Sequence, residues 1–240
     1  VIADMAIVVS RGEAGAEEFA SLGISKYRTK DYQGAITDLT KAIDTGSKDN
    51  FTHAARGLSF YALKEFEKSI PDLNRAIELG QHDSNIYFSR GAAKYALKDY
   101  KTALPDLDKA INTGTTDPIA FDMRGYCRYE DKNYNEAIKD FDEAIAKDPK
   151  LAQAFFHRGD TKFSVDNTAG AVQDYSQAIA LGLSDAILLN NRGKAYFKQE
   201  NYPLAIADFR SAIDKKPDYA KAYENRGMAY FNTKKFEEAA

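Results

Sequence analysis

A 34-residue period is the feature of this sequence that most constrains its fold. Seven glycines follow one another at intervals of 34 residues, with no insertion or deletion between any two. They are Gly23, Gly57, Gly91, Gly125, Gly159, Gly193 and Gly227. A fixed period of this length is typical of a repeat array, in which each unit buries its apolar face against its neighbours rather than in one central core. We therefore interpret residues 1–240 as a single array.

The residues around each glycine alternate between large and small side chains. Counting the glycine as position 0, position +4 is aromatic in all seven repeats, from Tyr27 to Phe231. In the six complete repeats, position +16 is large and positions +19 and +20 read Ala-Ile. Positions −4, 0 and +4 lie on one face of a helix, and positions +12, +16 and +19 lie on one face of a second. The pattern predicts an all-α chain of antiparallel helix pairs, in which the small residues allow close helix contact.

The turns between these pairs have residues of their own. Position +23 is glycine in four repeats, where a helix end needs a left-handed backbone. Three residues later stands an aspartate that can cap the next helix. The glycines are Gly46, Gly80, Gly114 and Gly182, and the aspartates are Asp49, Asp83, Asp117 and Asp185.

The period also predicts the boundaries of the repeats. Complete repeats begin near residues 17, 51, 85, 119, 153 and 187. Residues 1–11 align with a second helix, because Ile2 falls on Ile36, and residues 221–240 match the start of another repeat. Two interpretations of these incomplete ends stay open. The chain is a piece of a longer array, or its ends associate head to tail with a second copy.

The pattern resembles the tetratricopeptide repeat, and the resemblance covers essentially the whole chain. Asn191-Arg-Gly-Lys-Ala-Tyr-Phe, followed by Ala212-Ile213, is its clearest copy. The resemblance implies a right-handed α-solenoid whose first helices line a concave groove. It also implies a protein or peptide partner bound in that groove.

The expected groove residues occupy positions −3, +1, +4 and +5 of the first helices, with neighbouring asparagines. The early repeats are apolar there, the middle repeats acidic and the sixth basic, which would orient an extended peptide by charge. The alternative is that the aromatic side chains mainly fill the core. The candidates are Tyr61, Phe88, Tyr95, Asp122, Tyr126, Tyr129, Phe156, Asp160, Asn190, Asn191, Lys194, Lys198 and Asn225.

Some members of the family bind acidic C-terminal tails through a carboxylate clamp, which this sequence lacks. Phe156 and Asp160 stand where the clamp needs lysine and asparagine. Asn191 and Asn225 fit its middle position, and we expect them to bond a ligand backbone.

Arginine at position −1 and aspartate at position +15 recur through the array. We expect them to form buried pairs that join neighbouring repeats, for example Asp38 with Arg56. The alternative is a basic ladder for an acidic ligand. The residues are Asp38, Arg56, Asp72, Arg90, Asp106, Arg124, Asp140, Arg158, Asp174, Arg192, Asp208 and Arg226.

Composition and motifs narrow the function. A net charge of −3 argues against a nucleic-acid partner. No apolar run reaches the roughly 18 residues of a membrane span, so membrane insertion is not expected. The compartment is unknown, with the cytoplasm favoured. The sequence shows no phosphate loop, metal-ligand cluster or nucleophile elbow, so we expect neither a cofactor nor an enzymatic activity.

We therefore predict a non-enzymatic scaffold that binds an extended peptide or protein segment in its groove. One alternative is a structural module that self-assembles through its incomplete ends. Another is the substrate-recruiting arm of a larger enzyme.

Overall fold

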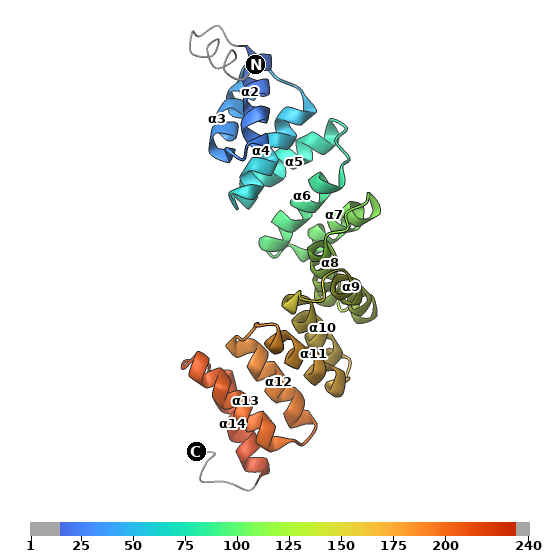
Figure 1. Cartoon of the computed structure of the whole chain (residues 1–240), viewed down its shortest axis with the longest axis vertical. Coiled ribbons are helices and arrows are strands. Elements are labelled where there is room, and N and C mark those ends of the chain that lie inside the picture. Colours follow the sequence, from blue (N-terminus) through green and yellow to red (C-terminus); the bar gives the residue numbers. More distant parts are fainter. Residues whose placement is uncertain (1–14, 234–240) are drawn as a thin grey trace. The chain divides into compact units, whose positions relative to one another are not determined.

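The computed structural model describes residues 15–233, and these form thirteen α-helices and no strand (Figure 1). The predicted second helix over residues 1–11, and the residues from Lys235 onward, lie outside this range. The helices are α2 (Ala16–Arg28), α3 (Tyr32–Asp44), α4 (Asn50–Ala62), α5 (Phe66–Glu78), α6 (Ser84–Ala96), α7 (Tyr100–Asn112), α8 (Pro118–Glu130), α9 (Tyr134–Lys147), α10 (Ala152–Ser164), α11 (Thr168–Ala180), α12 (Ala186–Lys198), α13 (Tyr202–Lys215) and α14 (Ala220–Asn232).

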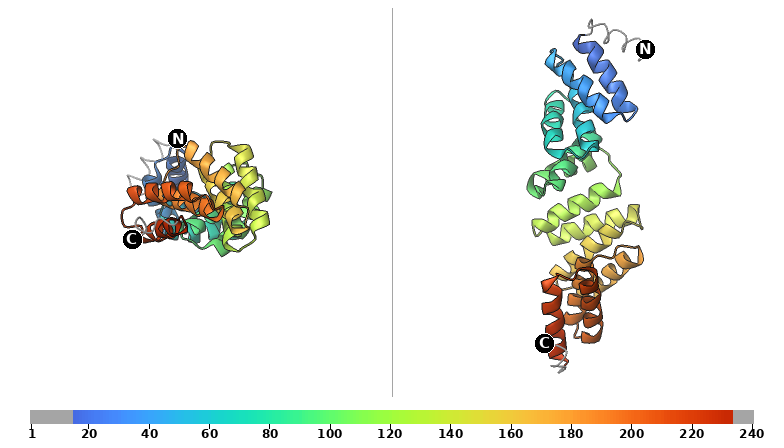
Figure 2. Two further views of the ribbon diagram at one scale, coloured as in Figure 1. Left: turned by 90° about the horizontal axis from the view of Figure 1, so that it is seen from below. Right: turned by 90° about the vertical axis from the view of Figure 1, so that its left-hand side faces the viewer.

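The chain divides into two compact units, Val1–Thr116 and Asp117–Ala240. In unit 1 the helix pairs are α2–α3, α4–α5 and α6–α7, and in unit 2 they are α8–α9, α10–α11 and α12–α13, followed by α14. Within each unit, consecutive helices lie side by side and the first helices of successive pairs also touch (Figure 2). This confirms the predicted all-α helical repeat solenoid. The single array over residues 1–240 stays a prediction.

The repeat glycines lie where the two helices of a pair touch. A Cβ atom on Gly193 would lie 2.6 Å from Phe209 Cε1, and one on Gly23 would lie 2.5 Å from Leu39 Cγ. Both contacts are far inside the usual 3.5–4.0 Å between carbon atoms. The partners occupy position +16, where every side chain is 0 or 1% exposed. They are Leu39, Leu73, Leu107, Phe141, Tyr175 and Phe209. The predicted role of the small residues is confirmed.

The turns follow the predicted chemistry except at Asp83, whose side chain makes no capping hydrogen bond at the start of α6. The four glycines at position +23 have φ between +96° and +109°. Asp49, Asp117 and Asp185 accept hydrogen bonds from backbone N–H groups of the helices that they precede. Positive φ was not predicted at position +7, where six non-glycine residues also adopt it. They are Lys30, Lys64, Lys98, Lys132, Asp166 and Glu200.

The Arg–Asp pairs form within a repeat, which corrects the expectation that they join neighbouring repeats. Arg56 donates from Nε to Asp72 Oδ2 at 2.7 Å and from Nη2 to Asp72 Oδ1 at 2.8 Å. Residue spacing explains the difference, because positions −1 and +15 stand on facing helices of one pair. The same pairing links Arg90 with Asp106, Arg124 with Asp140, Arg158 with Asp174, and Arg192 with Asp208.

The remaining guanidinium nitrogen provides the link between repeats. Nη1 of Arg56 donates to Thr40 in the preceding repeat at 3.2 Å. Arg90, Arg158 and Arg192 make the corresponding bonds to Asn74, Asp142 and Ser176. Each of these arginines therefore joins three helices.

The two ends of the arginine–aspartate series differ from its centre. Leu22 replaces the arginine of the first repeat, and Lys26 Nζ instead lies 2.7 Å from Asp38 Oδ2. Among residues 15–233, that oxygen accepts no well-aligned hydrogen bond. At the other end, the guanidinium of Arg226 lies 5.3 Å from the centre of the Tyr223 ring.

Candidate functional site

Two adjoining pockets lie along the first helices of unit 2. The apolar pocket, of about 260 Å³, is lined by Phe163, Lys194, Phe197, Lys198, Phe209, Asn225 and Met228. The polar pocket, of about 450 Å³, is lined by Tyr129, Tyr134, Asp160, Phe163, Ser164, Tyr175, Asn191 and Lys194. Because Phe163 and Lys194 border both pockets, the pockets form one continuous candidate site.

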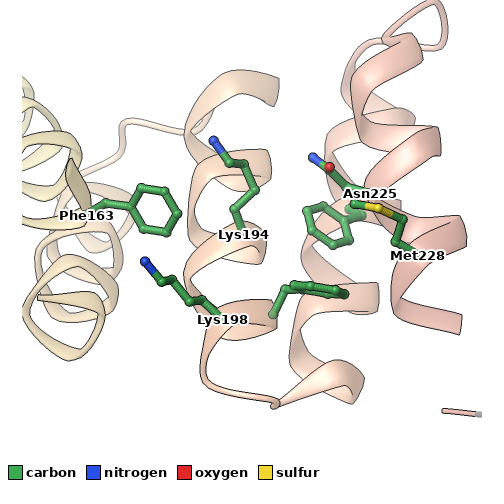
Figure 3. Close-up of a pocket in the computed structure, with 7 residues that line it drawn as sticks. Phe163, Lys194, Lys198, Asn225 and Met228 are labelled. Carbon is green, nitrogen blue, oxygen red and sulfur yellow. The ribbon is translucent and has the colours of Figure 1, made fainter. Parts of the chain in front are cut away.

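The apolar pocket combines aromatic walls with positive charge. The ammonium groups of Lys194 and Lys198 lie 5.0 and 5.6 Å from the centre of the Phe163 ring (Figure 3). Lys198 also pairs with Asp166 at 2.5 Å. Met228 is 45% exposed, so its side chain is available to a ligand. The site can receive an apolar side chain beside an anionic group.

Asp160 is the central charged group of the polar pocket. Its Oδ1 accepts hydrogen bonds from Tyr175 Oη at 2.7 Å and from Asn191 Nδ2 at 2.9 Å. Burial raises the pKa of the Asp160 carboxyl above its ordinary value, although both hydrogen bonds act in the opposite direction. Burial also raises the pKa of the Tyr129 phenol, with the charge of Asp160 adding to the rise.

Other predicted groove residues are buried between neighbouring first helices. His157 Nδ1 lies 2.9 Å from Asp122 Oδ1, and Asn225 Nδ2 donates to Asn190 Oδ1 at 2.8 Å. Asp122 is 6% exposed and Asn190 is 2% exposed. Position −3 of one repeat thus bonds position −2 of the next, because this stretch of the helix faces its neighbour. Asp122 and Asn190 lie in the interior rather than in the groove.

The predicted aromatic residues divide between the site and the core. Tyr61 and Tyr95 are half-buried, and their rings contact Phe66 and Tyr100 at 5.9 and 5.4 Å between centres. Tyr129 makes the same contact with Tyr134 at 5.7 Å but also lines the polar pocket.

The other three predicted aromatic residues are half-buried and outside both pockets. Tyr126 lies against His157, with ring centres 4.7 Å apart, and Phe156 lies against Tyr175 at 6.1 Å. Phe88 is also half-buried. These contacts are those expected of residues that fill the core.

Some lining residues were not expected from the sequence. Tyr134, Tyr175 and Phe209 come from second helices and reach the pockets between the first helices. Their positions, +9 and +16, carry the signal of core residues, so no sequence feature distinguished them as site residues.

Unit 1 has a pocket of its own on its first helices. Its volume is about 290 Å³, and Ile24, Leu58 and Ile86 contribute apolar walls beside Arg28. Phe51, at its edge, is 60% exposed. Ile24, Arg28 and Leu58 occupy the predicted groove positions +1 and +5, whereas Phe51 and Ile86 lie outside the predicted positions.

Comparisons with known proteins agree with this architecture. Sequence models described as TPR repeat or tetratricopeptide repeat match residues 54–118, 118–151 and 193–234. A comparison with curated proteins finds no match. The chain is a member of the tetratricopeptide repeat family, whose fold is a protein–protein interaction scaffold and in general a non-catalytic module.

Solved structures of low sequence identity share the fold. YrrB, described as a TPR protein with an unusual peptide-binding site, is 22% identical with a TM-score of 0.66, over 78% of this chain and 96% of its own. PilF of Pseudomonas aeruginosa is 17% identical with a TM-score of 0.67, over 89% and 97%. MamA is 24% identical with a TM-score of 0.60, over 65% and 85%.

Two absences concern residues 15–233. Over this range no helix is both long and apolar enough to cross a membrane. Among the same residues, no group of three or more histidines, cysteines and carboxylates is placed to hold a metal ion.

Proposed function

We propose that the two adjoining pockets of unit 2 bind an extended segment of a partner protein. The observation that carries this proposal is the apolar pocket, where the rings of Phe163, Phe197 and Phe209 lie beside Lys194 and Lys198. An apolar side chain of the segment enters this pocket, and an acidic side chain next to it meets the two lysines. The site in YrrB supports the proposal, since that protein has the same fold and is described as binding a peptide.

The expected binding free energies favour a partner segment with several contacts over a single bound side chain. Full burial of one large apolar side chain contributes about 1.5–3 kcal/mol, and an exposed ion pair adds about 0.2–1 kcal/mol. Together these stay below the roughly 4 kcal/mol that even millimolar binding requires. The partner therefore needs several contacts along the first helices, which an extended segment provides.

Selection from a displayed library of 12-residue peptides with blocked termini tests the proposal. Enriched peptides should carry an apolar residue beside an acidic one, and Lys194→Glu should weaken their binding about tenfold. Lys215→Glu is the matched control, because Lys215 is an exposed lysine on α13 that lines neither pocket. Equal binding by the wild type and Lys194→Glu would exclude this site.

The same preparation tests the two alternative functions. Light scattering over a hundredfold range of concentration should give a constant mass of 26.7 kDa for a monomeric scaffold. A mass that rises with concentration would instead support assembly through the chain ends. The role of a recruiting arm requires a catalytic domain elsewhere in the protein, and peptide selection on the full protein would reveal its substrate sequence.

A further inference from the structure

Asp160 has one carboxylate oxygen available to a ligand. Both of its hydrogen bonds within the described part of the chain, from Tyr175 and Asn191, fall on Oδ1. Oδ2 accepts none among these residues, and Asp160 is half-buried rather than buried. It borders a pocket of about 450 Å³ that is large enough for the end of a long side chain.

The walls of this pocket suit a positive charge. Tyr129, Tyr134 and Phe163 surround the carboxylate, and cations bind favourably over aromatic faces. The Phe163 ring already lies beneath two ammonium groups of the protein itself. The charge of Glu130 also acts on Tyr129 and adds to the negative potential of this end of the site.

Lys194 carries the charge opposite to that of Asp160, and its position distinguishes the polar pocket from the apolar pocket. Its ammonium lies over Phe163, at the border between the polar and apolar pockets. A ligand cation next to Asp160 therefore lies in the polar pocket, and the anionic group expected beside the apolar pocket lies at the two ammonium groups over Phe163.

We propose that the polar pocket binds a lysine or arginine side chain of the same partner segment that places an apolar side chain in the apolar pocket. The inference rests on the proposed function and adds the chemistry of the partner. A charge-assisted hydrogen bond to Asp160 Oδ2 neutralises a carboxylate that is otherwise partly desolvated. The segment then carries its basic residue at the polar pocket, its apolar residue at the apolar pocket, and its acidic residue at the two lysines over Phe163, where the pockets meet.

Asp160→Asn is the decisive variant for this inference. Asparagine keeps an oxygen that can accept from Tyr175 and Asn191, so the local structure is retained while the charge is lost. Glu130→Gln is the matched control, because Glu130 is an exposed carboxylate near the same pocket but not in its lining. Circular dichroism verifies that both variants fold.

Affinities of one peptide from the selection form a double-mutant cycle. The cycle compares this peptide with a neutral version of it, in which its lysine is replaced by norleucine or its arginine by citrulline. We expect Asp160→Asn to weaken binding of the original peptide about tenfold and Glu130→Gln to weaken it less than about threefold. The neutral peptide should bind the wild type about tenfold more weakly, and Asp160→Asn should add no further loss.

The outcomes separate this inference from the proposed function. Peptides that depend on Lys194 but contain no basic residue, or that bind Asp160→Asn as tightly as the wild type, would overturn the inference alone. A selection without any peptide sensitive to Lys194→Glu would overturn the proposed function, and the inference with it.

Discussion

Gly193→Ala tests whether the repeat glycine is required by the contact between paired helices. In a helix interior, alanine is normally more stable than glycine by about 1 kcal/mol. Here the new Cβ would lie 2.6 Å from Cε1 and 2.8 Å from Cδ1 of Phe209, whose side chain is fully buried. To relieve this clash, the Phe209 ring or one of the two helices must move by about 1 Å, so that the carbon atoms reach a normal contact distance. Overpacking of this kind costs about 1–3 kcal/mol, so we expect a net loss of up to about 2 kcal/mol.

The chain contains its own control for this substitution. At Gly91 the nearest atoms to an added Cβ are Asp106 Cβ and Leu107 Cγ, both at 3.1 Å. A neighbour there needs to move by only a few tenths of an ångström, so Gly91→Ala should change stability by less than about 0.5 kcal/mol. Combining Gly193→Ala with Phe209→Leu should recover part of the loss, because the ring that clashes is gone.

Hydrogen exchange on the amides of α12 and α13 is the appropriate assay. Repeat arrays can unfold in parts, so a single unfolding midpoint does not report the free energy of one helix pair. Faster exchange in this pair for Gly193→Ala, with no change for Gly91→Ala, is the expected result. A Gly193→Ala protein as stable as the wild type would refute the close-contact explanation of the 34-residue glycine period.

Three further predictions concern side chains with unusual surroundings. Arg192→Met leaves the buried Asp208 carboxylate without its two hydrogen bonds and should lower the unfolding free energy of this pair by about 3–5 kcal/mol; hydrogen exchange on the amides of the helix pair measures this, and a loss below about 1 kcal/mol would contradict a buried pair. Lys98→Gly removes a left-handed non-glycine residue, at φ +63°, and should raise stability by about 1 kcal/mol in the same assay. Asp160 has its pKa raised by folding, so its contribution to stability is fully present below the unfolded pKa and is lost as the pH rises through the folded pKa. Asp160→Asn should therefore remove this decline with pH, and unfolding curves measured across the mildly acidic range would show it.

The period of the sequence predicts the helix pairs but leaves the partner of each repeated residue ambiguous. Arg56 is 18 residues after Asp38 and 16 residues before Asp72. Both spacings recur with every repeat, so periodicity cannot distinguish a contact within a repeat from one between repeats. The structure resolves this in favour of Asp72, because the facing helices of one pair bring positions −1 and +15 together.

The site is less predictable than the fold for a related reason. A helix face inferred from spacing is broad, and small rotations decide whether position −3 or −2 reaches the pocket. Asp122 and Asn190, at position −3, bond neighbouring helices. Asn191 and Asn225, at position −2, line the pockets. Asn225 does so although it is buried and donates to Asn190. The spacing placed all four on the first helices but did not show which of them line a pocket.

Position +1 differs from the positions that build the fold, and under the proposed function this difference makes it the position that selects the partner. It directly follows the repeat glycine, yet it changes from apolar to acidic to basic along the chain: Ile24, Leu58, Ala92, Tyr126, Asp160, Lys194 and Met228. Each of the three pockets is lined by two of these residues. Packing requires a glycine at position 0 and a large side chain at position +16, whereas position +1 is buried at Leu58 and Ala92 but not at Asp160, Lys194 or Met228. Where position +1 is not buried, the repeat can vary its ligand chemistry without disturbing the contact that holds the helix pair together.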